Sequence, residues 1–289
     1  MKQFKLLLVI ALLAVFNKAT FGQVSEPKDT SDCTTTTLGN SNISFDLGAD
    51  LVTRYVWRGT QYGGNGPSIQ PNICFNWKGF SLGFWGAYST NGTNSSQELD
   101  LYLSYTFWKD MLTIGFTDYF FTNDSLHEDP LNFKQNATGH IFEPTLTFNG
   151  SDKIPFRLML AANVFGHDAY RINNDPTSDK FNKDDGIQYS SYLEVGYFTT
   201  IKDIDLDVFL GVNLTSPRGE DKTIFPVGDP TNFYMGESGF YGNKAGVVNL
   251  GFTIARELQI TEKYALPLSA SIILNPMSED YYFVFGFSF

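Results

Sequence analysis

The residues of this chain that could do chemistry are charged side chains at every second position of otherwise apolar segments. Between Ile43 and Arg58, odd positions are mostly apolar and even positions carry most of the polar and charged side chains. A period of two puts these two sets on opposite faces of a β-strand. Along the whole chain, the charged set selected for the candidate site is Arg54, Arg58, Glu98, Asp100, Arg157, Glu194, Asp205 and Asp207.

These side chains favour ion pairing and ion selection. Guanidinium and carboxylate groups attract one another strongly where water is partly excluded. Further acids on the same face, among them Asp46, Asp50 and Glu143, leave carboxylates in excess over the arginines. Rings of Asp and Glu in a pore favour cations. We therefore expect weak cation selectivity if the space that they line is open. The alternative is a structural lattice of ion pairs that fills this space.

Covalent catalysis has few candidate residues. The histidines are His127, His140 and His167, and the sequence contains no G-x-S-x-G, no Gly-rich phosphate loop and no CxxC. A nucleophile needs a base and an orienting group beside it, and a histidine in a polar loop is usually just solvated. The acid-rich stretch 175–185 lacks the ordered spacing of an EF-hand. We predict no catalytic residue, no metal site and no cofactor, so the chain is not expected to be an enzyme.

The alternation predicts twelve strands. We expect them at 43–57, 68–77, 80–89, 98–107, 111–121, 140–148, 155–165, 187–197, 204–215, 243–255, 265–274 and about 281–289. The connections alternate between short turns and long polar loops, and the loop 216–242 is the longest. This alternation is typical of bacterial outer-membrane barrels. The predicted fold class is all-β, a transmembrane antiparallel up-and-down β-barrel of about twelve strands.

The last stretch, Tyr281 to Phe289, places a wall of aromatic side chains on one face. In a closed barrel this face meets lipid and the strand edge is paired, so no unpaired strand edge remains to cause aggregation. A terminal Phe on alternating aromatics also resembles the signal that outer-membrane assembly machinery recognises. A core strand of a secreted β-sandwich is the alternative. The expected partners are outer-membrane lipid, the assembly machinery through the Phe289 strand, and small solutes.

The amino-terminal pattern indicates a targeting segment. Lysines at positions 2 and 5, an apolar run from Leu6 to Phe16 and small residues up to Gly22 predict a signal peptide over 1–22. We expect a flexible periplasmic lead over 23–42 and the barrel over 43–289. The formal net charge of −11 argues against nucleic acid as a partner. The predicted location is the outer membrane of a Gram-negative bacterium.

Two further residue types carry open questions. Cys33 lies in the polar lead and Cys74 in an expected strand; they could pair in an oxidising compartment, but we expect both unpaired. The second question concerns glycines on the inward face, which either clear space for a passage or relieve crowding in a curved wall. They are Gly48, Gly83, Gly115, Gly196, Gly211, Gly251 and Gly286.

Several of these segments resemble the TorF-type porin family. The segments are Leu51 to Gly59 (LVTRYVWRG), Pro67 to Pro71 (PSIQP), Glu98 to Tyr102 (ELDLY), Thr117 to Phe120 (TDYF), Tyr192 to Tyr197 (YLEVGY), Pro267 to Ser269 and Asn275-Pro276. The resemblance covers nearly the whole chain after the signal peptide, and several of its segments are ordinary barrel strands. It implies an outer-membrane porin and supplies no substrate and no catalytic residue.

The expected function is that of an outer-membrane porin that passes small hydrophilic solutes by diffusion. The alternative is a closed barrel that acts as a structural or surface-binding protein through its external loops. An outer-membrane enzyme that modifies lipids is the third possibility.

Overall fold

The computed structural model describes residues 43–90, 96–123, 129–135, 137–262 and 264–289, and every regular element within them is a β-strand. The predicted signal peptide and lead lie outside these residues. Among the described residues, no helix is long and apolar enough to cross a membrane.

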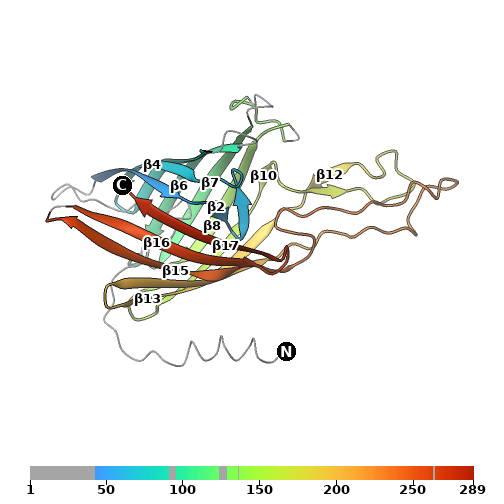
Figure 1. The fold of residues 1–289 in the computed structure, drawn as a ribbon. Coiled ribbons are helices and arrows are strands. Elements are labelled where there is room, and N and C mark those ends of the chain that lie inside the picture. The colour runs from blue at the N-terminus through green and yellow to red at the C-terminus, as the bar shows by residue number, and fades with distance from the viewer. Residues whose placement is uncertain (1–42, 91–95, 124–128, 136, 263) are drawn as a thin grey trace, which may run out of the picture.

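Twelve strands form one closed antiparallel wall (Figure 1). Its order is β1 (Ile43–Val52), β4 (Ser68–Trp77), β5 (Phe80–Ser89), β6 (Ser96–Phe107), β7 (Leu112–Asn123), β8 (His140–Phe148), β9 (Phe156–Ala162), β13 (Ser191–Ile201), β14 (Ile204–Asn213), β15 (Gly246–Thr261), β16 (Tyr264–Asn275) and β17 (Asp280–Ser288). Five short strands lie outside this count: β2 (Tyr55–Trp57), β3 (Thr60–Tyr62), β10 (Phe165–Gly166), β11 (Tyr170–Ile172) and β12 (Asp184–Ile187). β10 continues β9 along β8 after an irregularity, and the other four pair within the long loops.

The wall closes where β17 pairs with β1. The register places Val52 opposite Gly286 and Asp50 opposite Ser288. The backbone amide of Phe289 then donates to the carbonyl of Ala49 at 3.0 Å. The closed order confirms the predicted all-β barrel of twelve strands, because neither end of the sheet is left as an open edge.

The two faces of the wall follow the predicted period of two. In β5, Phe80, Leu82 and Phe84 are exposed on the outside, whereas Gly83 and Trp85 are buried inside. The same division holds on β1, β6, β9 and β14, whose outer residues are apolar and exposed. An apolar outer band around a closed antiparallel sheet is the surface that a lipid bilayer requires of a barrel.

The predicted boundaries of β4, β5 and β8 coincide with the observed ones. Others differ. β13 begins at Ser191 instead of 187, because 187 ends the short β12, which pairs with β11 in a loop that we predicted to have no strands. β15 runs to Thr261 instead of 255, and Thr261 pairs with Tyr264 at the start of β16. The chain therefore has short turns at one end of the barrel, the short-turn end, and long loops at the other, the long-loop end.

The prediction of one strand over 43–57 is wrong. β1 stops at Val52, and the next residues form a hairpin of β2 and β3 that turns into the barrel. Tyr55 and Trp57, which the alternation placed on the outer face, are buried instead. The hairpin keeps the period of two, so alternation alone does not distinguish it from a longer β1. Its turn residues Arg58 and Gly59 both have positive φ, 48° and 76°.

The expectation of two unpaired cysteines is also wrong. Cys74 is buried on the inner face of β4 and is disulfide-bonded. The only other cysteine of the sequence, Cys33, lies outside the described residues.

Candidate functional site

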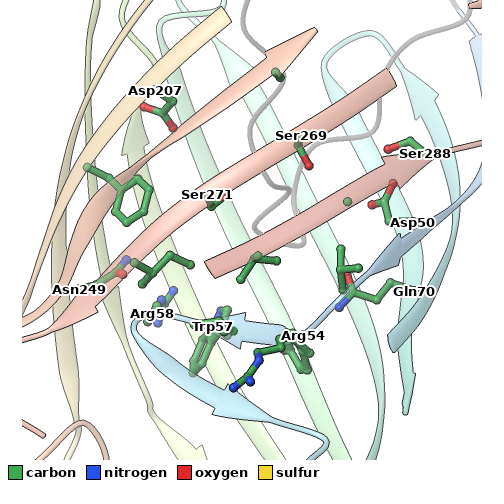
Figure 2. A pocket seen from close by; sticks show the side chains of 18 of the residues that line it. Asp50, Arg54, Trp57, Arg58, Gln70, Asp207, Asn249, Ser269, Ser271 and Ser288 are labelled. Atoms are coloured by element: carbon green, nitrogen blue, oxygen red, sulfur yellow. The ribbon is translucent and has the colours of Figure 1, made fainter. Parts of the chain in front are cut away.

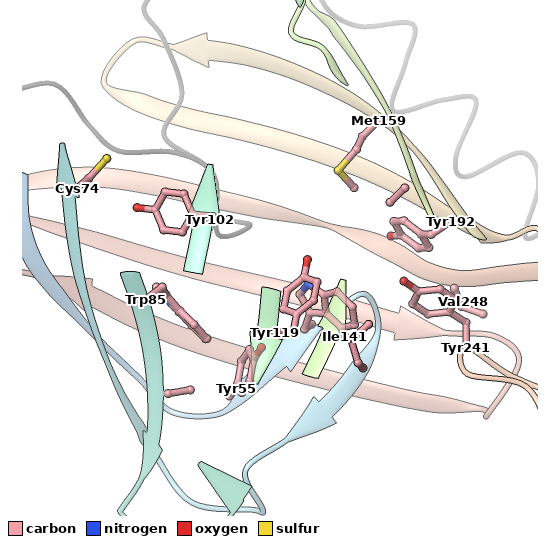
Figure 3. Packing of buried hydrophobic residues seen from close by; sticks show 13 residues of the cluster. Tyr55, Cys74, Trp85, Tyr102, Tyr119, Ile141, Met159, Tyr192, Tyr241 and Val248 are labelled. Atoms are coloured by element: carbon pink, nitrogen blue, oxygen red, sulfur yellow. The ribbon is translucent and has the colours of Figure 1, made fainter. Parts of the chain in front are cut away.

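The candidate site is the interior of the barrel, which we call the lumen, and the β2–β3 hairpin enters it from the long-loop end. Aromatic rings of the hairpin pack against rings of the wall. The ring centroids of Tyr55 and Trp85 of β5 are 5.3 Å apart, and those of Trp57 and Tyr119 of β7 are also 5.3 Å apart. Figure 3 shows this buried cluster, with Tyr55, Trp85 and Tyr119 drawn together. Packing of this kind holds the hairpin inside the barrel.

The turn of the hairpin carries an ion pair with the opposite wall. Arg58 donates from both terminal nitrogens to Glu143 of β8, at 2.5 and 2.9 Å. The Tyr119 hydroxyl donates to the same carboxylate at 2.9 Å. The side chains of Arg58 and Glu143 are 3% and 0% exposed, so both charges have left water. A bidentate pair with additional donors is the geometry in which buried charges are tolerated.

Aromatic faces complete the surroundings of this guanidinium. The Arg58 carbon lies 4.4 Å from the ring centroid of Trp57 and 4.5 Å from that of Tyr192. One nitrogen of Arg58 is also 2.6 Å from the hydroxyl of Tyr241. Cation–π contacts are strongest where water is excluded. We call Arg58, Glu143, Tyr119 and Tyr241 the lumen hub.

The tip of the hairpin touches the wall on the side away from β8. Asn275 of β16 donates to the backbone carbonyl of Gly59 at 3.1 Å. A Cβ at Gly59 would lie 2.0 Å from the carbonyl oxygen of Val248. Val248 is the extra residue of a β-bulge, since Gly211 pairs with Asn249 and Val212 with Val247. Contacts with β8 on one side and β15 and β16 on the other make the hairpin a bridge across the lumen.

The longest loop, between β14 and β15, also reaches the hub. Tyr241 belongs to this loop. Four residues earlier, Glu237 joins the loop to the β9–β13 connection. Glu237 accepts hydrogen bonds from the Arg218 side chain, at 2.5 and 2.8 Å, and from the backbone amide of Ile172 in the β9–β13 connection. Arg171 adds an ion pair at 3.2 Å. The two long loops therefore form one unit, which extends away from the barrel near β12 (Figure 1).

A second charged cluster lies on the inner wall of β9, β13 and β14. One nitrogen of Arg157 is 3.4 Å from both Glu194 and Asp207. The other oxygen of Glu194 accepts from the Tyr192 hydroxyl at 2.5 Å and from Asn249 at 3.1 Å. We call Arg157, Glu194 and Asp207 the wall cluster.

A cavity of about 190 Å³ lies between the hairpin and the inner wall, and both the hairpin base and the wall cluster line it. Figure 2 shows Arg54, Trp57 and Arg58 on the hairpin side, Asn249 on the wall beside Arg58, and Asp207 farther along the wall. Serines of β16 and β17 add neutral polar groups to the lining. The cavity thus offers charged, hydroxyl and aromatic surfaces to a small solute.

The remaining predicted site residues are spread around the lumen. Arg54 lines the cavity and donates to Gln61 across the hairpin at 2.9 Å. Glu98 and Asp100 are buried on β6, and Glu98 accepts a hydrogen bond from Tyr55. Asp205 accepts from Thr200 at 2.7 Å. The structure therefore brings Arg157, Glu194 and Asp207 together and keeps the others in separate contacts.

The inward glycines provide room for neighbouring side chains. A Cβ at Gly83 would lie 2.3 Å from the Tyr102 hydroxyl, and a Cβ at Gly211 would lie 1.9 Å from the Tyr192 hydroxyl. The space that these two glycines leave is therefore filled by aromatic side chains, which favours relief of crowding over a cleared passage at these positions.

Sequence reasoning missed much of the hub. The sequence places Glu143 on the inner face but not among the predicted site residues, and it places Tyr241 in the longest loop, 216–242. The one signal available in the sequence was Gly59 followed by three more glycines up to Gly66, which is typical of a turn. Nothing in the sequence around Tyr241 indicates that this side chain enters a barrel.

The histidine at the start of β8 has partners on both ring nitrogens. Nδ1 of His140 is 2.8 Å from an Asp118 oxygen, and Nε2 is 3.0 Å from the carbonyl oxygen of Pro130. Asp168, the acid next to His167, accepts from Asn163 and from the backbone amide of Ser190. Within the described residues, no group of three or more His, Cys, Asp or Glu side chains is placed to hold a metal ion.

Comparisons with known proteins give two findings. A family model described as "bacterial protein of unknown function (Gcw_chp)" matches residues 36–169. The fold is similar to the crystal structure of an outer membrane channel from Pseudomonas putida, at 12% sequence identity and a TM-score of 0.39, over 84% of this chain and 92% of that one. No curated protein matches the chain. The barrel itself follows from the chain's own strand pairing.

Proposed function

We propose that this protein is an outer-membrane channel of the TorF-type porin kind, which passes small hydrophilic solutes by diffusion and weakly favours cations. The observation that carries the proposal is the contrast between the two faces of one closed wall. Apolar side chains cover the outside, whereas the inside holds a polar and charged cavity. A closed sheet with lipid outside and a wet, charged interior is the arrangement found in porins.

The β2–β3 hairpin makes this a narrow channel. It bridges the lumen between Glu143 on one side and Asn275 on the other. Solutes must pass beside it, through the space lined by Arg54, Asp50 and the wall cluster. Pore size is set by what fills the barrel, since a wall of twelve strands lies between filled barrels of eight and open ones of sixteen.

The proposed orientation follows from loop length. Short turns face the periplasm and long loops face the outside in bacterial barrels. The hairpin then enters the lumen from the external side. Outer-membrane lipid would contact the apolar band, and the assembly machinery would recognise the strand that ends at Phe289.

The alternative function, a closed barrel that works through its external loops, is favoured by one specific observation. The hairpin and Tyr241 meet at the hub in the middle of the lumen, where both charges are buried. If no path remains beside the hub, the joined long loops become the functional surface. We propose no catalytic role, because the sequence offers three histidines and no nucleophile motif beside them.

Ion conductance separates these functions. The chain without its signal peptide is refolded and inserted into a planar bilayer with a salt gradient across it. We expect reproducible current steps and a reversal potential whose sign corresponds to a preference for cations. Silence from a barrel shown to be folded favours the closed alternative, and a reversal potential of the opposite sign contradicts the selectivity. Release of fatty acid from phospholipid would instead indicate an enzyme.

A further inference from the structure

The wall cluster contains a buried carboxylate oxygen that is not satisfied by the protein. Asp207 is 1% exposed, and its Oδ2 is 3.4 Å from Arg157. Its Oδ1 has no hydrogen-bond partner among the described residues, although it is buried and Asp207 lines the cavity. A buried carboxylate oxygen without a donor is costly. Asp207 therefore presents to the cavity a carboxylate that the described part of the protein satisfies on one oxygen only.

The charges around this oxygen set the sign of a ligand in the cavity. Within the wall cluster, Arg157 supplies one positive charge, and Glu194 and Asp207 supply two negative charges. Glu194 is already engaged, because it accepts from Tyr192, Asn249 and Arg157. Three other charged residues line the cavity: Arg58 is already paired with Glu143, and Arg54 and Asp50 carry opposite charges. The remaining negative charge therefore falls on Asp207, so the ligand should carry a positive charge and a donor hydrogen.

A second unsatisfied acceptor lines the same cavity, at a distance from Asp207 along the wall. Oδ1 of Asn249 is buried, lines the same cavity and has no partner within the described part of the chain. The register pairs Asp207 with Thr253 and Gly211 with Asn249, so the two acceptors lie on neighbouring strands with Phe209 between them on the inner face. Figure 2 shows Asp207 and Asn249 separated along the wall. The acceptors are thus spread along the cavity and do not converge on one point.

This spread argues for an organic cation over a metal ion. Alkaline-earth ions need several oxygens at short range, and no such group of acids is present among the described residues. A primary ammonium group has three donor hydrogens and a carbon body that can rest on an aromatic face. Phe209 is buried beside Asp207 and lines the cavity.

We propose that the cavity binds small protonated primary amines, with the ammonium group donating to the carboxylate of Asp207 and the carbon body against Phe209. This inference rests on the proposed channel function and names the solute class that its inner cavity selects. Asp207 is then the residue that determines the preference among cations.

The test compares ethylammonium with potassium in planar bilayers. Ethylammonium chloride is placed on one side and potassium chloride on the other, and the reversal potential gives the permeability ratio. Wild type is expected to favour ethylammonium. Asp207→Asn keeps the shape and the contact with Arg157 but removes the charge. It should lower the ratio roughly tenfold, the factor that one hydrogen bond to a charged group contributes.

The control variant is Asp46→Asn, the same change at another buried acid of the inner wall, which does not line the cavity. It should keep the wild-type ratio. A wild-type channel without ethylammonium preference, or equal ratios in wild type and Asp207→Asn, overturns the inference while the channel function stands.

A binding measurement keeps the inference testable without conduction. Ethylammonium chloride should raise the melting temperature of the wild-type barrel above its value in equal potassium chloride, and Asp207→Asn should lose this difference. If the barrel does not conduct but the difference is present, the channel function fails and the amine site remains. If wild type shows no difference, the site is contradicted.

Discussion

The guanidinium of Arg58 and the carboxylate of Glu143, 85 residues apart in sequence, form a bidentate ion pair inside the barrel. The first belongs to a hairpin that follows β1, and the second belongs to the wall strand β8. Their contact fixes a loop of the long-loop end inside the lumen. The stability of the barrel and the width of its interior therefore depend on the same pair.

Removing one partner should affect both properties. Arg58→Ala leaves Glu143 as a buried charge without its guanidinium, which costs about 3–5 kcal/mol for a buried pair. We expect a lower free energy of unfolding in urea and larger current steps, because the hairpin loses its hold on β8. Arg256 and Asp203, an ion pair whose side chains are 60% and 59% exposed, provide the control. Arg256→Ala should cost at most about 1 kcal/mol. Equal losses in the two variants would contradict the importance of the hub.

The close approach at the hairpin tip gives a second prediction. Gly59→Ala puts a methyl group 2.0 Å from the Val248 carbonyl oxygen, where there is no room. Gly64→Ala also sits at positive φ, 84°, but meets nothing within 4 Å. Both variants carry the backbone strain of about 1 kcal/mol, and only Gly59→Ala should displace the hairpin. Fluorescence of Trp57, in a variant whose other tryptophans are replaced by Phe, measures the displacement. A shift to longer wavelength in both variants would show that strain alone moves the hairpin.

Acid should separate the two long loops. Burial raises the pKa of Glu237, but hydrogen bonds from Arg218 and from the Ile172 amide outweigh it, so the pKa lies below the ordinary value. A carboxyl whose folded pKa is depressed stabilises the joined loops above its unfolded pKa of about 4.3, and this stability is lost as pH falls through the folded pKa. Spin labels at Asp179 and Thr231 should report a longer distance in acid. Glu237→Gln should show the longer distance already at pH 7. A distance that is the same at pH 7 and in acid for wild type argues against this contact.

The disulfide at Cys74 predicts a redox dependence. The sequence has one other cysteine, so Cys33 is the expected partner and neither thiol should react with an alkylating reagent before reduction. Cys33→Ser and Cys74→Ser should each lower the free energy of unfolding by about 2–4 kcal/mol. The double variant should lose no more than either single variant. Two alkylated thiols in the unreduced, denatured protein would contradict the pairing.

The wall could be predicted from the sequence, because each strand carries its own evidence. In β5, apolar side chains at every second position meet lipid, and this local pattern alone gives both the boundaries and the outer face. The contents of the lumen are different. Arg58 meets Glu143 and Tyr241 only after distant segments have folded together, so no local pattern records the contact. The hairpin was missed for a related reason, since Tyr55 and Trp57 alternate like the strand before them.

We propose above that the barrel is a channel narrowed by the β2–β3 hairpin. The most direct test is the single-channel conductance of wild type and of a variant in which residues 55–62 are replaced by a short Gly-Ser link. We predict small, cation-favouring steps for wild type and clearly larger steps for the variant, both from barrels shown to be folded. Equal steps in the two proteins would contradict the role of the hairpin, and silence in both would contradict the channel.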